Sequence, residues 1–194
     1  NKKMDNTIVA SGCRFTQSDG TWPYHIEQQK YGWVHNVGDT GAGNSYISRS
    51  VIFEVNRLLS LGKNPQDIEV IVMWSGISRK EFLSTKRENP MHEYWLKGKD
   101  KNWYGNFIHD EHWKRHPIKD SVWIKSSIPY MNWSNKAVTK FLEMYWKHFY
   151  TEEESLINTL ESILRLQWYL NSVGVKYKMM CWQNIFNKYS FRVP

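Results

Sequence analysis

The apolar residues of the chain gather in short runs that predict buried β-strands. One run is almost unbroken and rich in β-branched residues, which is typical of a central strand covered on both faces; it contains Ile68, Val70, Ile71, Val72 and Met73. The other runs are shorter, and a glycine lies close to one end of each. Strands are therefore predicted at 7–11, 33–37, 67–74 and 175–182.

Between these runs, apolar residues recur at helical spacing. A short helix is predicted to open at Trp22-Pro23, because proline fits the first turn of a helix. A longer helix carries Ile47, Val51 and Val55 on one face and ends at Gly62. Both helices lie between predicted strands, so the first half of the chain alternates strand and helix.

Two more helices are predicted in the second half of the chain. One opens at Ser134, and its apolar stripe contains Val138, Phe141, Leu142, Tyr145 and Phe149. The next begins with a capping box formed by Thr151 and Glu154 and ends at Gly174, immediately before the last predicted strand.

Strands that alternate with helices through short turns predict βαβ units and a mainly parallel sheet between helices. We therefore expect one α/β domain over 1–194, a three-layer α/β/α sandwich. The exception is 79–133, which is polar, is interrupted by proline and reads as a large insertion or lid. It holds five tryptophans: Trp95, Trp103, Trp113, Trp123 and Trp133.

Composition adds an excess of aromatic residues and of positive charge. The chain has 11 Trp and 11 Tyr among 194 residues, and 26 basic against 19 acidic residues give a net charge of +7. A positive net charge favours anionic partners over long range. The charges are dispersed, however, without a block of five Lys or Arg, so a solvated surface is favoured over a nucleic-acid interface.

The chain shows no sequence sign of membrane insertion or export. No apolar stretch reaches the roughly 18 residues of a membrane span, and the first residues lack the apolar run of a signal peptide. Cys13 and Cys181 each lie in or beside an apolar run, which favours free core thiols over a disulfide. We expect a soluble protein of the reducing cytoplasm, or of the host cytoplasm if the chain is viral.

Functional groups of an open parallel sheet gather at the carboxyl ends of its strands. After the first predicted strand stands Ser11-Gly12-Cys13-Arg14-Phe15-Thr16. This segment resembles the first signature block of the SGNH/GDSL hydrolases, in the Gly-Cys-Ser-Phe-Thr form associated with viral and bacterial members. Aligned on Gly12 and Cys13, the nucleophilic serine of the family falls on Arg14. The resemblance implies a flavodoxin-like sandwich and an esterase site.

The other blocks of the family match less well. Its second block supplies a backbone N–H to the oxyanion hole, and 36–41 resembles it, with Gly41 as the equivalent. The third block has an asparagine after the central strand, where this chain has Ser75-Gly76. The fourth, Asp-x-x-His, is not found after Val175. We therefore expect that a C-terminal piece carrying it is missing from the chain.

The residues at these turns define the predicted site. Ester hydrolysis needs a nucleophile, a base and oxyanion donors, and arginine stays protonated in proteins, so it is no nucleophile. Cys13 and Ser11 are weaker substitutes, because a neighbouring position on a strand points to the other face. The predicted pocket consists of Arg14, Gly41, Asn44, Ser75 and Arg79 beneath aromatic residues, with Trp74, Trp103 and Trp113 as binding residues.

The segment 109–116 is the densest cluster of histidine and acidic residues. His112 and Asp110 are the candidates for a displaced base and acid, and His112 with His116 would share one face of a helix. An exposed polar loop is the simpler interpretation, because no second pair of metal ligands accompanies them. We expect neither a metal nor a cofactor.

Three functions remain open. The first is an SGNH-type esterase acting on a small-molecule or glycan ester, impaired because Arg14 replaces the serine. The second is a non-catalytic protein of the same fold that holds an anionic or sugar ligand with Arg14 and the aromatic residues. The third, less favoured, is nucleic-acid binding through the positive surface.

Overall fold

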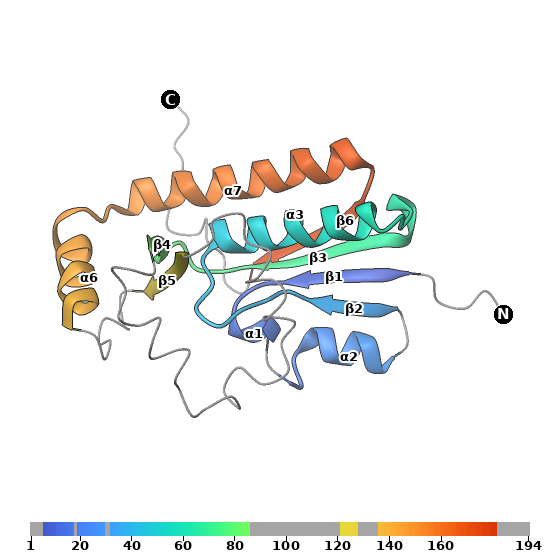
Figure 1. The fold of residues 1–194 in the computed structure, drawn as a ribbon, viewed down its shortest axis with the longest axis horizontal. Coiled ribbons are helices and arrows are strands. Elements are labelled where there is room, and N and C mark those ends of the chain that lie inside the picture. Colours follow the sequence, from blue (N-terminus) through green and yellow to red (C-terminus); the bar gives the residue numbers. More distant parts are fainter. Residues whose placement is uncertain (1–5, 18, 30–31, 86–120, 128–135, 182–194) are drawn as a thin grey trace.

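Four parallel strands form the main sheet, with helices on both of its sides (Figure 1). The computed structural model describes residues 6–17, 19–29, 32–85, 121–127 and 136–181, with 83–85, 121–127 and 136–138 described by their backbone alone. The strands are β1 (Thr7–Ser11), β2 (Trp33–Asn36), β3 (Ile68–Trp74) and β6 (Lys176–Cys181), in the order β2-β1-β3-β6. Every neighbouring pair is parallel, as the sequence predicts.

The helices that connect these strands cover opposite sides of the sheet. The helix α2 (Trp22–Gln28) joins β1 to β2 on one side, whereas α3 (Asn44–Ser60) and α7 (Glu152–Val173) lie on the other (Figure 1). Crossovers between parallel strands are right-handed, so a chain that steps first to one side of β1 and then to the other places its helices on opposite faces. The predicted α/β class, with helices on both sides of a parallel sheet, is confirmed.

The main core lies between the sheet and the helices α3 and α7. Val9 of β1 pairs with Val70 of β3, and because side chains alternate along a strand, Val9, Val70 and Val72 share one face. The core residues that the two helices place against this face include Ile47, Val51, Val55, Leu166 and Leu170. The apolar face predicted for the segment 47–58 is therefore the buried face of α3.

The predicted helix ends are found at α7. The hydroxyl of Thr151 accepts a hydrogen bond from Glu154 N at 3.1 Å, which satisfies one of the free N–H groups of the first turn. At the other end, Gly174 adopts a left-handed conformation with φ of 71°, which glycine takes at little cost. The capping residue and the terminating glycine are both confirmed.

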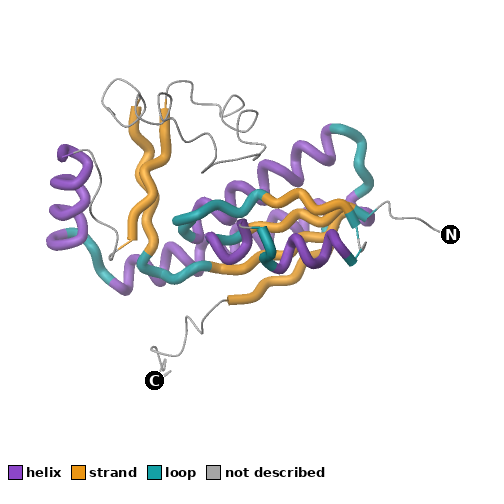
Figure 2. Tube along the Cα trace, turned by 90° about the horizontal axis from the view of Figure 1, so that it is seen from below, coloured by secondary structure: helices purple, strands orange, loops and turns teal. Residues whose placement is uncertain are grey.

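The predicted insertion contains two strands that the hydrophobic pattern did not reveal. The strand β4 (Arg79–Thr85) pairs antiparallel with β5 (Ser121–Ser127), with Arg79 opposite Ser127. Their apolar residues form only two short runs, 82–83 and 122–124, inside a polar segment, which explains why no strand was predicted there. Figure 2 shows this ribbon and the helix α6 (Lys136–His148) at one end of the molecule. It is the end at which the carboxyl termini of the sheet strands lie.

Aromatic contacts join the ribbon to α6. The ring of Phe82 on β4 meets the rings of Phe141 and Tyr145 edge to face, with centroids 4.9 and 4.8 Å apart. Such pairs contribute about 0.5–1.5 kcal/mol each beyond the area they bury. Phe141 and Tyr145 belong to the stripe predicted for this helix, so the stripe packs against the ribbon.

The two cysteines differ in burial, although the sequence predicted both to lie in the core. Cys13 and Cys181 are both free, as predicted, but only Cys13 is buried, because Cys181 ends the edge strand β6 and is exposed. In the part of the chain that the structure describes, there is no helix with the length and apolar character needed to span a membrane. Two short elements, α1 (Arg14–Gln17) and the 3-10 turn η1 (Pro65–Asp67), complete the fold.

Candidate functional site at the carboxyl edge of the sheet

The turn after β1 lifts Arg14 to the surface and keeps Cys13 inside. Backbone N–H groups of Thr16 and Gln17 donate to Cys13 O at 2.8 and 3.2 Å, which closes the single turn of α1. Arg14 opens this turn and is exposed, whereas Cys13 is fully buried. The guanidinium of Arg14 lies over the ring of Phe15, 5.3 Å from its centroid. The predicted directions of side chains 13 and 14 are confirmed.

Glycine is required at position 12 by a close approach of the central strand. A Cβ atom there would lie 2.9 Å from Met73 O and 2.2 Å from the hydroxyl of Thr16. Both distances are shorter than real Cβ contacts, and the first involves backbone that cannot turn aside. The glycine of the signature segment therefore lets the turn after β1 pack directly on β3.

The turn after β2 is bonded to the turn after β1. Asp39 N donates to Gly12 O at 3.0 Å, and the side-chain amide of Asn36 donates to Thr16 O at 2.6 Å. The side chain of Gln17 accepts hydrogen bonds from both the backbone N–H and the hydroxyl of Thr40. The two turns that the sequence predicted to be neighbours are therefore side by side.

Gly41 lies in this second turn with φ of 80°, in the left-handed region that favours glycine. Its turn is closed by Ala42 N, which donates to Asp39 O at 3.0 Å. Arg79, the first residue of β4, donates from its guanidinium to Ala42 O at 3.4 Å. Arg79 therefore contacts the turn after β2 directly, whereas Arg14 belongs to the turn that is bonded to it through Gly12 O and Thr16 O.

Asn44 and Ser75 hold the end of β3 to α3 and do not line the surface. Asn44 Oδ1 accepts from Ser75 N at 2.8 Å, and Asn44 Nδ2 donates to Ser75 O and to the hydroxyl of Thr159, both at 3.1 Å. Both residues are buried, and both N–H groups of the amide are used. The prediction that these side chains line a pocket is wrong; they clamp three elements together.

The aromatic part of the predicted site is only partly described. Trp74 is 1% exposed and belongs to the core between the sheet, α3 and α7, so its prediction as a binding residue is wrong. Its position follows from the alternation of β3, which turns every second side chain to the helices. Trp103, Trp113, His112 and Asp110 lie outside the described residues.

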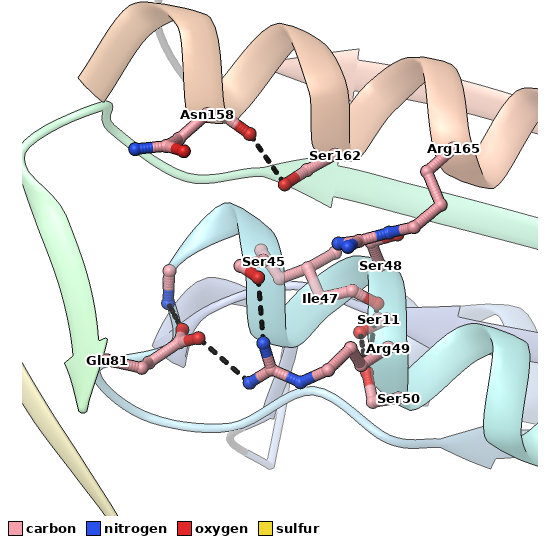
Figure 3. Close-up of polar contacts among 11 residues, drawn as sticks. Ser11, Ser45, Ile47, Ser48, Arg49, Ser50, Glu81, Asn158, Ser162 and Arg165 are labelled. Atoms are coloured by element: carbon pink, nitrogen blue, oxygen red, sulfur yellow. Dashed lines mark hydrogen bonds and ion pairs between the residues drawn. The ribbon is translucent and has the colours of Figure 1, made fainter. Parts of the chain in front are cut away.

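Glu81 is a residue of this region that sequence reasoning missed. Its carboxylate accepts from Gly43 N at 2.6 Å and pairs with Arg49 at 3.0 Å, and its side chain is 2% exposed (Figure 3). The carboxylate thereby occupies the N-terminus of α3, where the free N–H groups and the helix dipole favour negative charge. Burial raises the pKa of Glu81, because the loss of water outweighs Arg49 and the N–H of Gly43. No local pattern signals a contact across 38 residues.

A second buried carboxylate joins β2 to α3. Glu54 Oε1 lies 2.9 Å from His35 Nδ1 and 2.5 Å from a guanidinium nitrogen of Arg57. Burial raises the pKa of Glu54, but the hydrogen bonds from Arg57 and His35 outweigh it and lower the pKa to about 2. His35 sits within β2 rather than in the turn after it, so this cluster ties the edge strand to the core.

No family model and no curated protein matches this chain. The site therefore has to be judged by its own chemistry. Among the described residues, no three histidine, cysteine, aspartate or glutamate side chains gather as metal ligands would. What the carboxyl edge does offer is the exposed cation Arg14 in the turn after β1, and the half-buried cation Arg79 bonded to the glycine turn after β2.

Proposed function

We propose that this chain is an SGNH-like α/β protein that binds a small anionic ligand, such as an acidic sugar, without hydrolysing it. The observation that carries the proposal is the position of Arg14. Arg14 is exposed and belongs to the turn after β1. This turn lies beside the turn after β2, because Asp39 N donates a hydrogen bond to Gly12 O. A permanent cation thus occupies the place that the resemblance gives to a serine nucleophile.

The groups around Arg14 argue against hydrolysis by a substitute nucleophile. The thiol of Cys13 and the hydroxyls of Ser11 and Ser75 belong to fully buried residues. The Ser11 hydroxyl is also within 3.0 Å of the Ser50 hydroxyl, on the face covered by α3. A nucleophile must reach its substrate, so among the described residues of these turns the exposed guanidinium is the better ligand group.

Arg14 alone would bind weakly. An exposed ion pair contributes about 0–1 kcal/mol, whereas millimolar affinity corresponds to about 4 kcal/mol. The remainder has to come from further contacts, for which Arg79 offers the guanidinium N–H groups that it does not use on Ala42 O. A planar guanidinium donates two parallel hydrogen bonds to a carboxylate or a phosphate, which favours these groups over halide ions.

An ester hydrolase of SGNH type is the second candidate. The observation in its favour is the pairing of the turns after β1 and β2, because a serine at position 14 would lie beside the turn of Gly41. An Arg14→Ser variant would then gain activity on a short-chain nitrophenyl ester. If that variant has no more esterase activity than the parent chain, the hydrolase hypothesis is wrong.

Calorimetric titration of the full chain with glucuronate tests the binding proposal, with glucose as the neutral probe. We expect millimolar binding of glucuronate, little binding of glucose, and a loss of about 2–5-fold in Arg14→Ala. Lys176→Ala is the matched control, because Lys176 is an exposed cation at the start of β6 and thus at the opposite edge of the sheet.

Three outcomes would overturn the proposal. The parent chain does not bind glucuronate, or it binds glucose equally well, or Arg14→Ala binds as tightly as the parent. Strong binding of a single-stranded oligonucleotide that weakens steeply with salt, and equally in both variants, would instead favour the nucleic-acid reading. The two free thiols support a reducing compartment, and we infer the cytoplasm.

A further inference from the structure

The outer side of α7 carries a stripe of exposed apolar side chains. Ile157, Leu164 and Trp168 are 55%, 44% and 67% exposed. Their spacings of seven and four residues place them on one face of the helix. The opposite face, with Leu166 and Leu170, is buried against the core. α7 runs along the outside of the molecule, so its outer face is accessible (Figure 1).

The stripe also contains one charge of each sign. Glu161 and Arg165 are exposed and lie one turn apart, between Ile157 and Trp168. One nitrogen of Arg165, Nε, donates to the hydroxyl of Ser48 at 3.2 Å, which holds the guanidinium along the side of α7 that faces α3 (Figure 3). A guanidinium has four further N–H groups, so this contact leaves it able to meet a carboxylate.

The order of these residues is self-complementary under a twofold axis. If two copies of α7 run antiparallel with the axis near residue 163, Glu161 of one copy faces Arg165 of the other, twice. In the same arrangement Ile157 faces Trp168, and the two Leu164 side chains meet near the axis. Because α7 spans Glu152–Val173, this axis also lies at the middle of the helix, so both helices overlap along their whole length.

We propose that this face of α7 binds a second copy of the chain, in an antiparallel helix pair. A parallel pair would place Glu161 against Glu161 and Arg165 against Arg165, so the charges select the antiparallel arrangement. The twofold pairing is of the isologous kind that most homodimers use.

The size of the face sets the strength of the contact. A helix of 22 residues is about 33 Å long and about 10 Å wide, so it covers roughly 330 Å². A stable interface buries about 800 Å² on each partner. The face covers less than half of that area, so the dimer is weak, and it forms and dissociates with concentration.

Sedimentation equilibrium of the full chain from about 10 μM to about 1 mM tests this inference. The parent chain should shift from monomer to dimer over this range, and Leu164→Lys should weaken association at least about tenfold. Leu61→Lys is the matched control, because Leu61 is also exposed but lies at the end of α3. The helical circular dichroism of each variant shows whether it is folded.

Reversal of the charges at Glu161 and Arg165 is the more specific test. Glu161→Arg gives two positive charges at these positions and Arg165→Glu gives two negative charges, so each variant alone should stay monomeric. Mixed in equal amounts, the two variants should form a dimer with at least the parent's affinity. The inference is overturned if the parent is monomeric at 1 mM, if Leu164→Lys associates like the parent, or if the mixture associates no better than either variant.

Discussion

Gly12 shows how one residue determines the packing of the turn after β1. The absent Cβ lets Met73 O of β3 approach the turn, and the same glycine accepts the bond from Asp39 N through its carbonyl. The sequence alone indicated a tight turn here and an exposed side chain 14. It did not indicate that Asn44, Ser75 and Trp74 are buried, because burial depends on helices that are distant in the chain.

Replacement of Gly12 by alanine should destabilise the fold. The new Cβ would meet backbone of the central strand, and overpacking of this kind costs about 1–3 kcal/mol. The measurement is the free energy of unfolding in urea. Gly20→Ala is the comparison: no atom lies within 4 Å of that Cβ, so only the positive φ of 74° is strained, at about 1 kcal/mol. An equal loss in both variants would contradict the close approach.

The ionisation of Glu54 should make the free energy of unfolding depend on pH in the acid range. Its folded pKa of about 2 lies below the ordinary value of 4.5, so the folded state favours the ionised form. This stabilisation is fully present above pH 4.5 and is lost as the pH falls from there to about 2; the shift corresponds to about 3 kcal/mol. Unfolding measured from pH 2 to 7 should show a smaller loss in Glu54→Gln than in the parent. Parallel pH profiles would refute the role of the ion pairs.

At the scale of elements, the sequence located the four sheet strands and the helices α2, α3, α6 and α7. The hydrophobic pattern is strongest where an element buries an apolar face, as β1, β3, α3 and α7 do, whereas α2 was predicted from Pro23 in its first turn. The hydrophobic pattern failed for β4 and β5, because their apolar residues form only the short runs 82–83 and 122–124 among polar ones. Their position depends instead on Glu81, Lys80 and Phe82, which contact other elements through single side chains.

The contacts of Glu81 predict how firmly the ribbon is held. In Glu81→Ala, the N-terminus of α3 and Arg49 lose their shared carboxylate, and removal of such a buried partner costs about 1–3 kcal/mol. Backbone amides of β4 and β5 should then exchange with solvent about 5–100 times faster, while those of β1 and β3 keep their rates. Hydrogen exchange measures this directly.

Glu69→Ala is the control for that experiment, because Glu69 also forms an ion pair, with Lys178 at 2.9 Å, but lies on β3 away from the ribbon. Its ribbon amides should exchange as in the parent. If Glu81→Ala leaves the exchange of β4 and β5 unchanged, the carboxylate does not hold the ribbon, and the aromatic contacts of Phe82 would carry that role.

At the scale of the whole molecule, the fold brings the turns after β1 and β2 to one edge and adds a ribbon beside them. The parallel direction of the strands could be predicted from the sequence, because it follows from the alternation of strands and helices. The partners of Glu81 and Glu54 could not, because these contacts join elements through tertiary packing alone. The ligand site we propose depends both on the parallel strands, which bring the turns together, and on the tertiary contacts, which hold the ribbon beside them.

The most direct test of the account is to locate the bound anion on the folded chain. Two-dimensional amide NMR of the full chain, titrated with glucuronate, should shift the signals of 12–17 and 38–43 at millimolar ligand, and Arg14→Ala should need about 2–5 times more ligand for the same shifts. Shifts that concentrate on other segments, or shifts at 12–17 that follow the same ligand concentrations in Arg14→Ala as in the parent, would contradict the claim that Arg14 and the turn after β2 form the binding site.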